Sequence, residues 1–219
     1  MLQLSTLKFL KDLQKNNNRP WFEAHRKQYE TAKEDFLLIL EKLIPAIATF
    51  DAPIGSLKPR DCTFRINRDV RFSKDKSPYK NNMAAYFNRH GKKSNGAGYY
   101  LHIEPGRSFA AGGLWQPEPN DLAKIRQEID YSFDNWKKVI GAPSFKKTFV
   151  EGVKGDALVR PPKGYQETNP AITFLKMKSF VVTHSFSDAA VQSKTFVKDV
   201  ANTFKTMKPF IDFLNAAMD

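Results

Sequence analysis

The periodicity of apolar residues changes twice along this chain, and that change restricts the folds it can adopt. From Cys62 to Trp115 the sequence has the pattern of strands, whereas the segments before and after this region carry apolar residues at helical spacing. Pro105-Gly106 lies between two strand-like runs, and a tight turn there pairs its strands antiparallel. The pattern therefore predicts an antiparallel sheet with helices before and after it in the sequence.

The first fifty residues predict a helical hairpin. Ser5 or Thr6 is expected to cap a first helix, which ends at the asparagines 16–18 because asparagine tolerates turn conformations. Pro20 suits the start of a second helix, which continues to about Phe50 on one apolar stripe.

The remaining elements complete an α+β fold. The expected strands are residues 63–67, 83–88, 98–104, 108–114 and 180–186. Helices are expected at residues 119–140, 145–150, 169–177 and 187–218, with a loop at 152–168. We predict one domain over residues 1–219, in which an N-terminal helical hairpin precedes a mostly antiparallel central sheet and C-terminal helices pack on one face. Trp115, Trp136 and Phe180 are expected to fill its core.

The sequence also indicates a compartment. Cys62 is the only cysteine, so no internal disulfide can form. The N-terminus has no basic segment followed by an apolar run, and no stretch approaches the roughly 20 apolar residues that cross a bilayer. We therefore expect a cytoplasmic protein with no membrane partner. No metal site is expected, and the cofactor and the oligomeric state stay open.

Positive charge is concentrated in one region of the chain. The formal net charge is +12, and residues 60–93 contain ten basic and three acidic residues, a net of +7. Such a field favours anionic partners, among them phosphorylated metabolites and nucleic acid. The alternative interpretation is that the charge mainly keeps the protein in solution.

The densest part of this region is residues 65–80, which read RINRDVRFSKDKSPYK. This segment resembles the signature R-x-x-R-D-x-R-F-x-x-D-K-x-x-Y of a bacterial family called domain of unknown function 2461. The residues that match this family near the N-terminus are Asn17, Trp21, Phe22, His25 and Tyr29. The resemblance extends over nearly the whole chain, and it implies a shared fold and a set of candidate residues but no activity.

Our leading functional hypothesis is an anion site in an Arg-rich cleft. Guanidinium groups grip phosphate or carboxylate with paired hydrogen bonds, and lysines add less directional charge. The expected ligand-binding residues are Arg65, Arg68, Arg71, Lys76, Tyr79 and Lys80. Whether the protein is an enzyme stays open, and Asp69, Asp75 and Tyr79 are the candidates for an orienting or acid–base role.

Two alternatives compete with this hypothesis. In the first, the arginines and Asp69 and Asp75 form an internal network that braces a non-catalytic structural or interaction protein. In the second, the protein is a nucleic-acid-binding module whose strand aromatics stack on bases; the candidates are Tyr86, Phe87, Tyr99 and Tyr100. None of the zinc-finger, helix-turn-helix or RNP1 patterns supports the second alternative.

Five further residues are secondary site candidates. Asn17, Arg19 and His25 could line a wall opposite the Arg-rich segment, or they could merely end and cap helices. His102 and Glu104 place two polar groups on one strand face, but the sequence shows no third metal ligand beside them.

Overall fold

The computed structural model describes residues 1–89, 91–92 and 95–218. Its centre is one sheet of four antiparallel strands in the order β1 (Met83–Phe87), β2 (Gly98–Ile103), β3 (Ser108–Leu114) and β4 (Phe180–Phe186). The predicted α+β class is confirmed. β3 and β4 have the predicted bounds, and β1 and β2 each end one residue earlier than predicted.

The N-terminal helices are α1 (Leu4–Lys15), α2 (Arg19–Ala24) and α3 (Arg26–Ala48), followed by the short turns η1 (Ala52–Ser56) and α4 (Pro59–Cys62). The predicted cap was wrong: α1 begins after Gln3, and the Thr6 hydroxyl inside the helix donates to Asp35 Oδ2 at 2.6 Å. The second predicted helix is divided at His25. The backbone dihedrals of His25 (φ −112°, ψ 16°) are not helical, and its ring stacks on Trp21.

The helices after β3 are α5 (Pro119–Tyr131), α6 (Phe133–Gly141), α7 (Pro143–Thr148), α8 (Ile172–Leu175), α9 (Asp188–Val191) and α10 (Phe196–Ala216). The predicted helix 119–140 is divided at Ser132, whose dihedrals are not helical. Ser187 caps a helix as predicted, but it caps α9, and the long last helix starts only at Phe196. The helix predicted at residues 169–177 is shorter in the structure. The Asn169 side chain accepts from the Ala171 N–H, and α8 starts only after Ala171.

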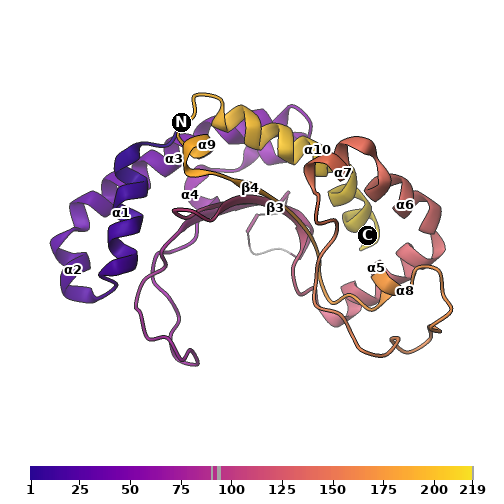
Figure 1. The fold of residues 1–219 in the computed structure, drawn as a ribbon. Coiled ribbons are helices and arrows are strands. Elements are labelled where there is room, and N and C mark those ends of the chain that lie inside the picture. The colour runs from indigo at the N-terminus through magenta and orange to yellow at the C-terminus, as the bar shows by residue number, and fades with distance from the viewer. Residues whose placement is uncertain (90, 93–94, 219) are drawn as a thin grey trace.

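The four strands and the helices form an arch (Figure 1). Helices α3 and α10 lie over the outer, convex side of the sheet, and α10 packs directly against β3. The inner, concave side carries no helix (Figure 1). The N-terminal helices continue the arch on one side, and α5 to α8 continue it on the other.

The alternation of side chains along the strands separates a covered face from an open one. In β2, Tyr99, Leu101 and Ile103 are buried against the helices, whereas Tyr100 and His102 are half-buried on the opposite face. Trp136, as predicted, is fully buried among phenylalanines, including Phe180. Trp115 was predicted to lie in the core and is 65% exposed, because it follows the buried Leu114 by one residue and therefore projects to the other face.

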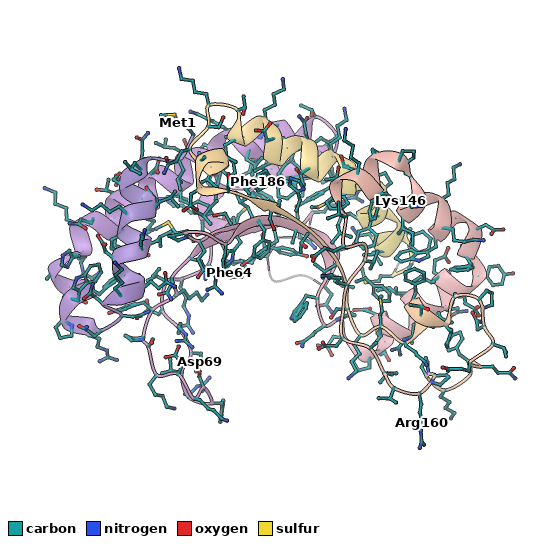
Figure 2. The ribbon with its side chains drawn as sticks, in the orientation of Figure 1. Met1, Phe64, Asp69, Lys146, Arg160 and Phe186 are labelled. Atoms are coloured by element: carbon teal, nitrogen blue, oxygen red, sulfur yellow. The ribbon has the colours of Figure 1, made fainter. Side chains whose placement is uncertain are left out.

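The segment 63–81, which we call the arm, extends away from the edge of β1 (Figure 2). The strand predicted at 63–67 does not form, and only isolated bridges join Thr63 to Ala85 and Asn67 to Tyr79. The reason is that the segment leaves the sheet and folds back on itself: Arg68 N–H donates to Pro78 O at 2.9 Å, and Lys80 N–H donates to Ile66 O at 2.8 Å.

Candidate ligand-binding site

A pocket of about 750 Å³ lies on the open face of the sheet. We call it the sheet pocket. Its aromatic lining consists of Phe64, Tyr86, Tyr100, Phe109 and Trp115. Tyr86 and Tyr100 are register partners on β1 and β2, and Tyr100 is in turn paired with Ala111 on β3. Small side chains on β3 beside large rings on β1 and β2 leave a hollow that a planar molecule can fill.

Glycine at position 98 is required for the shape of this pocket. A Cβ on Gly98 would lie 2.8 Å from atoms at the end of the Tyr86 ring and 2.4 Å from the Phe87 carbonyl oxygen. The Tyr86 hydroxyl donates to Gly96 O at 2.7 Å, which fixes the ring in this position. Burial raises the pKa of Tyr86, so its hydroxyl stays protonated.

Two lysines lie beside Phe64 at one edge of the pocket, and Arg65 is close to one of them. Lys80 Nζ lies 5.4 Å from the centre of the Phe64 ring and Lys92 Nζ lies 5.5 Å from it. Burial lowers the pKa of Lys80, and the positive charges of Arg65 and Lys92 lower it further, so Lys80 lies close to both. We call Arg65, Lys80 and Lys92 the basic cluster.

The basic cluster has little internal compensation. Among the residues that the structure describes, no carboxylate lies within ion-pair distance of Arg65, Lys80 or Lys92. Lys92 Nζ donates to the Thr63 carbonyl oxygen, but neither Arg65 nor Lys80 has a hydrogen-bonding partner for its side chain in that part of the chain. The nearest compensation that the electrostatics indicate is Asp69, whose pKa the charge of Arg65 helps to lower without forming an ion pair. Like charges that lack an ion-pair partner repel one another, and an anion would relieve this repulsion.

The other two predicted arginines are paired inside the arm. Arg68 forms an ion pair with Asp75 and also donates to Ser77 O at 3.1 Å. Arg71 donates to both oxygens of Asp69, from Nε at 3.0 Å and from NH2 at 2.7 Å. These carboxylates are therefore used within the arm, and neither lines the sheet pocket.

The hydrogen bonds of Asp75 shape the end of the arm. Its Oδ1 accepts from the Ser77 hydroxyl at 2.6 Å and from the Ser77 N–H at 2.9 Å. The two bonds from Ser77, together with the Arg68 guanidinium, lower the pKa of Asp75 to about 2. Asp69 has its pKa lowered in the same way by Arg71. Lys76 Nζ donates to Val70 O at 3.0 Å across the same loop.

Tyr79 and Asn17 join the arm to the N-terminal helices. The Tyr79 ring is buried and stacks on Phe22, with ring centres 3.9 Å apart. Asn17 accepts from the Tyr79 N–H at 3.0 Å and donates to the Tyr79 carbonyl oxygen at 2.9 Å and to Asn81 Oδ1 at 2.9 Å. Neither residue lines the sheet pocket.

Arg19 and His25 also lie away from the sheet pocket. Arg19 is exposed at the start of α2. His25 stacks on Trp21, with ring centres 4.0 Å apart, and its Nδ1 lies 2.8 Å from the Trp21 carbonyl oxygen. Cys62 is buried, and burial raises the pKa of its thiol to about 11, so the thiol is a poor nucleophile.

A chain of polar groups runs along β2 on the open face. Tyr100 Oη lies 3.1 Å from His102 Nδ1, and His102 Nε2 lies 3.1 Å from Glu104 Oε2. Arg107 donates to the other oxygen of Glu104 at 2.6 Å, and Phe109 stacks on the His102 ring at 4.6 Å. Positions 100, 102 and 104 share one face because successive residues of a strand alternate.

The donor and acceptor capacity of these side chains determines which nitrogen of His102 carries the hydrogen. A carboxylate only accepts, so Glu104 requires a hydrogen on His102 Nε2, which leaves Nδ1 to accept from the Tyr100 hydroxyl. Burial lowers the pKa of His102 and Glu104 only partly offsets this effect, so the ring is neutral near pH 7. Burial, together with the negative charge of Glu104, raises the pKa of Tyr100 to about 12.

The structure therefore brings together part of the predicted site and adds residues to it. Arg65 and Lys80 meet at Phe64, and Tyr100, one of the four aromatics considered for base stacking, faces the sheet pocket beside Phe64. Phe87 and Tyr99 point to the covered face. Lys92, Phe64 and Trp115 were not predicted as site residues. The sequence signals for the first two were the position of Phe64 directly before Arg65 and the position of Lys92 within the basic region 60–93.

Metal ligands do not gather in the described residues: no group of three or more histidine, cysteine, aspartate or glutamate side chains there could hold a metal ion. His102 and Glu104 contact each other without a third such residue. In the same residues, no helix combines the length and the apolar character that a membrane crossing needs.

The fold and the site define an α+β protein with an aromatic pocket on the open face of its sheet. The chain belongs to the family described as "Conserved hypothetical protein (DUF2461)", whose model matches residues 5–213 of the 219. The family predicted from the sequence is therefore confirmed. No curated protein and no solved structure matches the chain.

Proposed function

We propose that the sheet pocket binds a small molecule that carries an aromatic ring and a phosphate or carboxylate group. The observation that carries this proposal is the basic cluster: three cations without a carboxylate partner among the described residues, placed at the edge of an aromatic pocket. The ring of the ligand would lie among Phe64, Tyr100 and Trp115, and its anionic group would reach Lys80 and Lys92. Arg65 adds a forked donor to the same edge.

In this proposal the arm has two different parts. Its base, at Arg65 and Lys80, contacts the ligand. Its outer loop holds its own shape through Arg68, Arg71 and Lys76, whose side chains are engaged within the arm. Tyr79 supports the base of the arm by stacking on Phe22.

Benzylphosphonate, which has one ring and one phosphonate, tests the proposal by isothermal titration calorimetry. We expect binding to the wild-type protein, and a loss of about tenfold in affinity in Lys80→Gln and in Lys92→Gln, because each variant removes one charge-assisted hydrogen bond. Lys205→Gln is the matched control, since this exposed lysine lies on α10, away from the pocket. Equal affinity in all three variants, or no binding to the wild type, would contradict the proposal.

Binding of single-stranded nucleic acid is the second candidate. It is favoured by exposed basic residues in both downward extensions of the arch. Arg71 and Lys74 follow Asp69, which is labelled in the arm, and Arg160 is labelled in the long loop on the other side (Figure 2). Affinity for a short oligonucleotide would then fall steeply with salt, and Arg160→Gln would weaken it without changing benzylphosphonate binding. A single-phosphonate ligand that binds more tightly than the oligonucleotide favours the first proposal.

A further inference from the structure

We propose that the sheet pocket is a phosphoester-cleaving site in which Tyr100 is the nucleophile, His102 the base that takes its proton, and Glu104 the residue that orients His102. This inference rests on the proposed function and names the substrate class: a phosphoester with an aromatic group. Its basis is the continuous set of contacts Tyr100 Oη to His102 Nδ1 at 3.1 Å and His102 Nε2 to Glu104 Oε2 at 3.1 Å, which begins at a residue that lines the pocket.

The arrangement has the parts that an activated hydroxyl needs. A nucleophilic oxygen requires a base within hydrogen-bonding distance, and the base requires a third group that fixes its tautomer and stabilises its charged form. Glu104 is buried and is held in turn by Arg107, and the ring of Phe109 stacks on His102. The imidazole therefore cannot rotate freely, and Nδ1 stays directed at Tyr100.

A tyrosine in this environment depends on its base. Burial and the negative charge of Glu104 disfavour a free phenolate at position 100. Proton transfer to His102 has to accompany the attack, and the resulting imidazolium is stabilised by Glu104. The raised pKa thus agrees with an oxygen that is activated only when a substrate is bound.

The basic cluster supplies the charge that phosphoryl transfer needs. Cleavage of a phosphoester places negative charge on the oxygens around phosphorus, and positioned cations stabilise it. Tyr100 and the two lysines share Phe64 as a neighbour: the Phe64 and Tyr100 ring centres are 6.1 Å apart, and Lys80 and Lys92 lie over the Phe64 ring. Lys92 also lines the same pocket as Tyr100.

The reaction is a double displacement. Tyr100 Oη forms a bond to phosphorus, the bond between phosphorus and the ester oxygen breaks, and the electron pair leaves on that oxygen. The Tyr100 proton passes to His102 Nδ1 and from there to the leaving alcohol. Water then attacks the phosphotyrosine with His102 as its base, and Tyr100 leaves with the proton that His102 returns.

The test is release of p-nitrophenolate from p-nitrophenyl phosphate, measured in a chelator to silence contaminating metal-dependent phosphatases. We expect Tyr100→Phe and His102→Gln to reduce the wild-type rate by about a hundredfold or more. The matched controls are Tyr131→Phe and His184→Gln, prepared identically. Tyr131 is 91% exposed at the end of α5, and His184 contacts the Thr148 carbonyl oxygen outside the sheet pocket. Both controls should retain the wild-type rate.

Benzylphosphonate binding separates the possible failures, because this compound has no ester bond to cleave. Retained affinity in Tyr100→Phe and His102→Gln shows that both variants are folded and that only the chemical step is lost. If benzylphosphonate binds but release is absent, or is equal in the wild type and the Tyr100→Phe variant, the nucleophile is overturned and the proposed function stands. If neither binding nor release occurs, both proposals fall.

Discussion

At the scale of single residues, Asn17 shows how a side chain outside the pocket holds the chain on both sides of Lys80. Its amide satisfies both backbone groups of Tyr79 and also contacts Asn81, across 62 residues of sequence. These bonds place the base of the arm, and with it Lys80, against the N-terminal helices. Asn17 therefore acts on the basic cluster through the position of the arm.

We expect Asn17→Ala to lower the free energy of unfolding by about 1–2 kcal/mol, since it leaves partly buried backbone groups of the arm without partners. Urea denaturation followed by circular dichroism measures this change. The control is Asn202→Ala on α10, where the side chain is exposed and the effect should stay within about 0.5 kcal/mol. Equal stabilities of the two variants would show that the arm does not depend on Asn17.

Arginines of one short segment have different roles because their neighbours differ. Arg68 and Arg71 each have an aspartate on the outer loop, and Arg65, at the base of the arm, has none among the described residues. The spacing of the three arginines could not reveal this difference. The hypothesis of an internal network describes the geometry of Arg68 and Arg71. Of the residues predicted to bind an anion, only Arg65 and Lys80 remain in the proposed site.

At the scale of elements, the arm is a narrow ribbon that is held by polar contacts near its end. The carboxylate of Asp75 accepts from Ser77 twice and pairs with Arg68. Its pKa is lower in the folded arm than the ordinary value, so ionisation of Asp75 stabilises the folded arm. That contribution is present above pH 4 and is lost as the pH falls through the folded pKa of about 2.

We expect the carboxyl carbon of Asp75 to titrate with a midpoint near 2 in an NMR experiment. Ser77→Ala should raise this midpoint more than Arg68→Gln does, because the bond from the Ser77 hydroxyl has the largest effect on the carboxylate. A wild-type midpoint at the ordinary aspartate value, or a larger effect of the arginine variant, would refute this description of the arm.

Most strands could be predicted from the sequence, but several helix ends could not. The alternation from Ser108 to Leu114 and from Phe180 to Phe186 is bounded by turn residues, so local sequence determines both strands. The interruption of the second predicted helix at His25 depends on the stacking of its ring on Trp21. Ring stacking of this kind is set by packing and leaves no periodic signal in the sequence.

The candidate site was only partly predictable for a related reason. Alternation in β2 separates Tyr99 from Tyr100, but it does not say which face the helices cover, and this choice decides that Tyr100 and His102 lie in the open. Trp115 was wrongly predicted to fill the core, although it follows the buried Leu114 by one position and lines the open face. Lys92 meets Lys80 only because the chain returns past Phe64, which is a tertiary contact.

At the scale of the whole molecule, the arch explains why a pocket exists on this sheet. Helices α3 and α10 bury the convex face, and the chain between β3 and β4 forms the helices on the far side of the arch instead of covering the concave face (Figure 1). The open face therefore keeps its aromatic rings accessible. The arm brings Arg65 and Lys80 to one edge of it, beside Lys92, while Glu118 and Asp121 lie at another part of the lining.

This distribution of charge predicts how a ligand is oriented. In the proposed binding mode, an anionic group would avoid the side of Glu118 and Asp121 and approach Lys80 and Lys92. The ring of the ligand would then extend over the strands toward Tyr100. This orientation would place the phosphoryl group of the proposed substrate on the side of the pocket where the lysines and Tyr100 share Phe64 as a neighbour.

A crystal structure of the wild-type protein with benzylphosphonate tests the central claim most directly. We predict that the phosphonate oxygens lie within hydrogen-bonding distance of Lys80 Nζ and Lys92 Nζ, with the benzyl ring against Phe64 and Tyr100. A phosphonate bound instead at Arg68 or Arg71 on the outer arm, or an empty sheet pocket at saturating ligand, would contradict it.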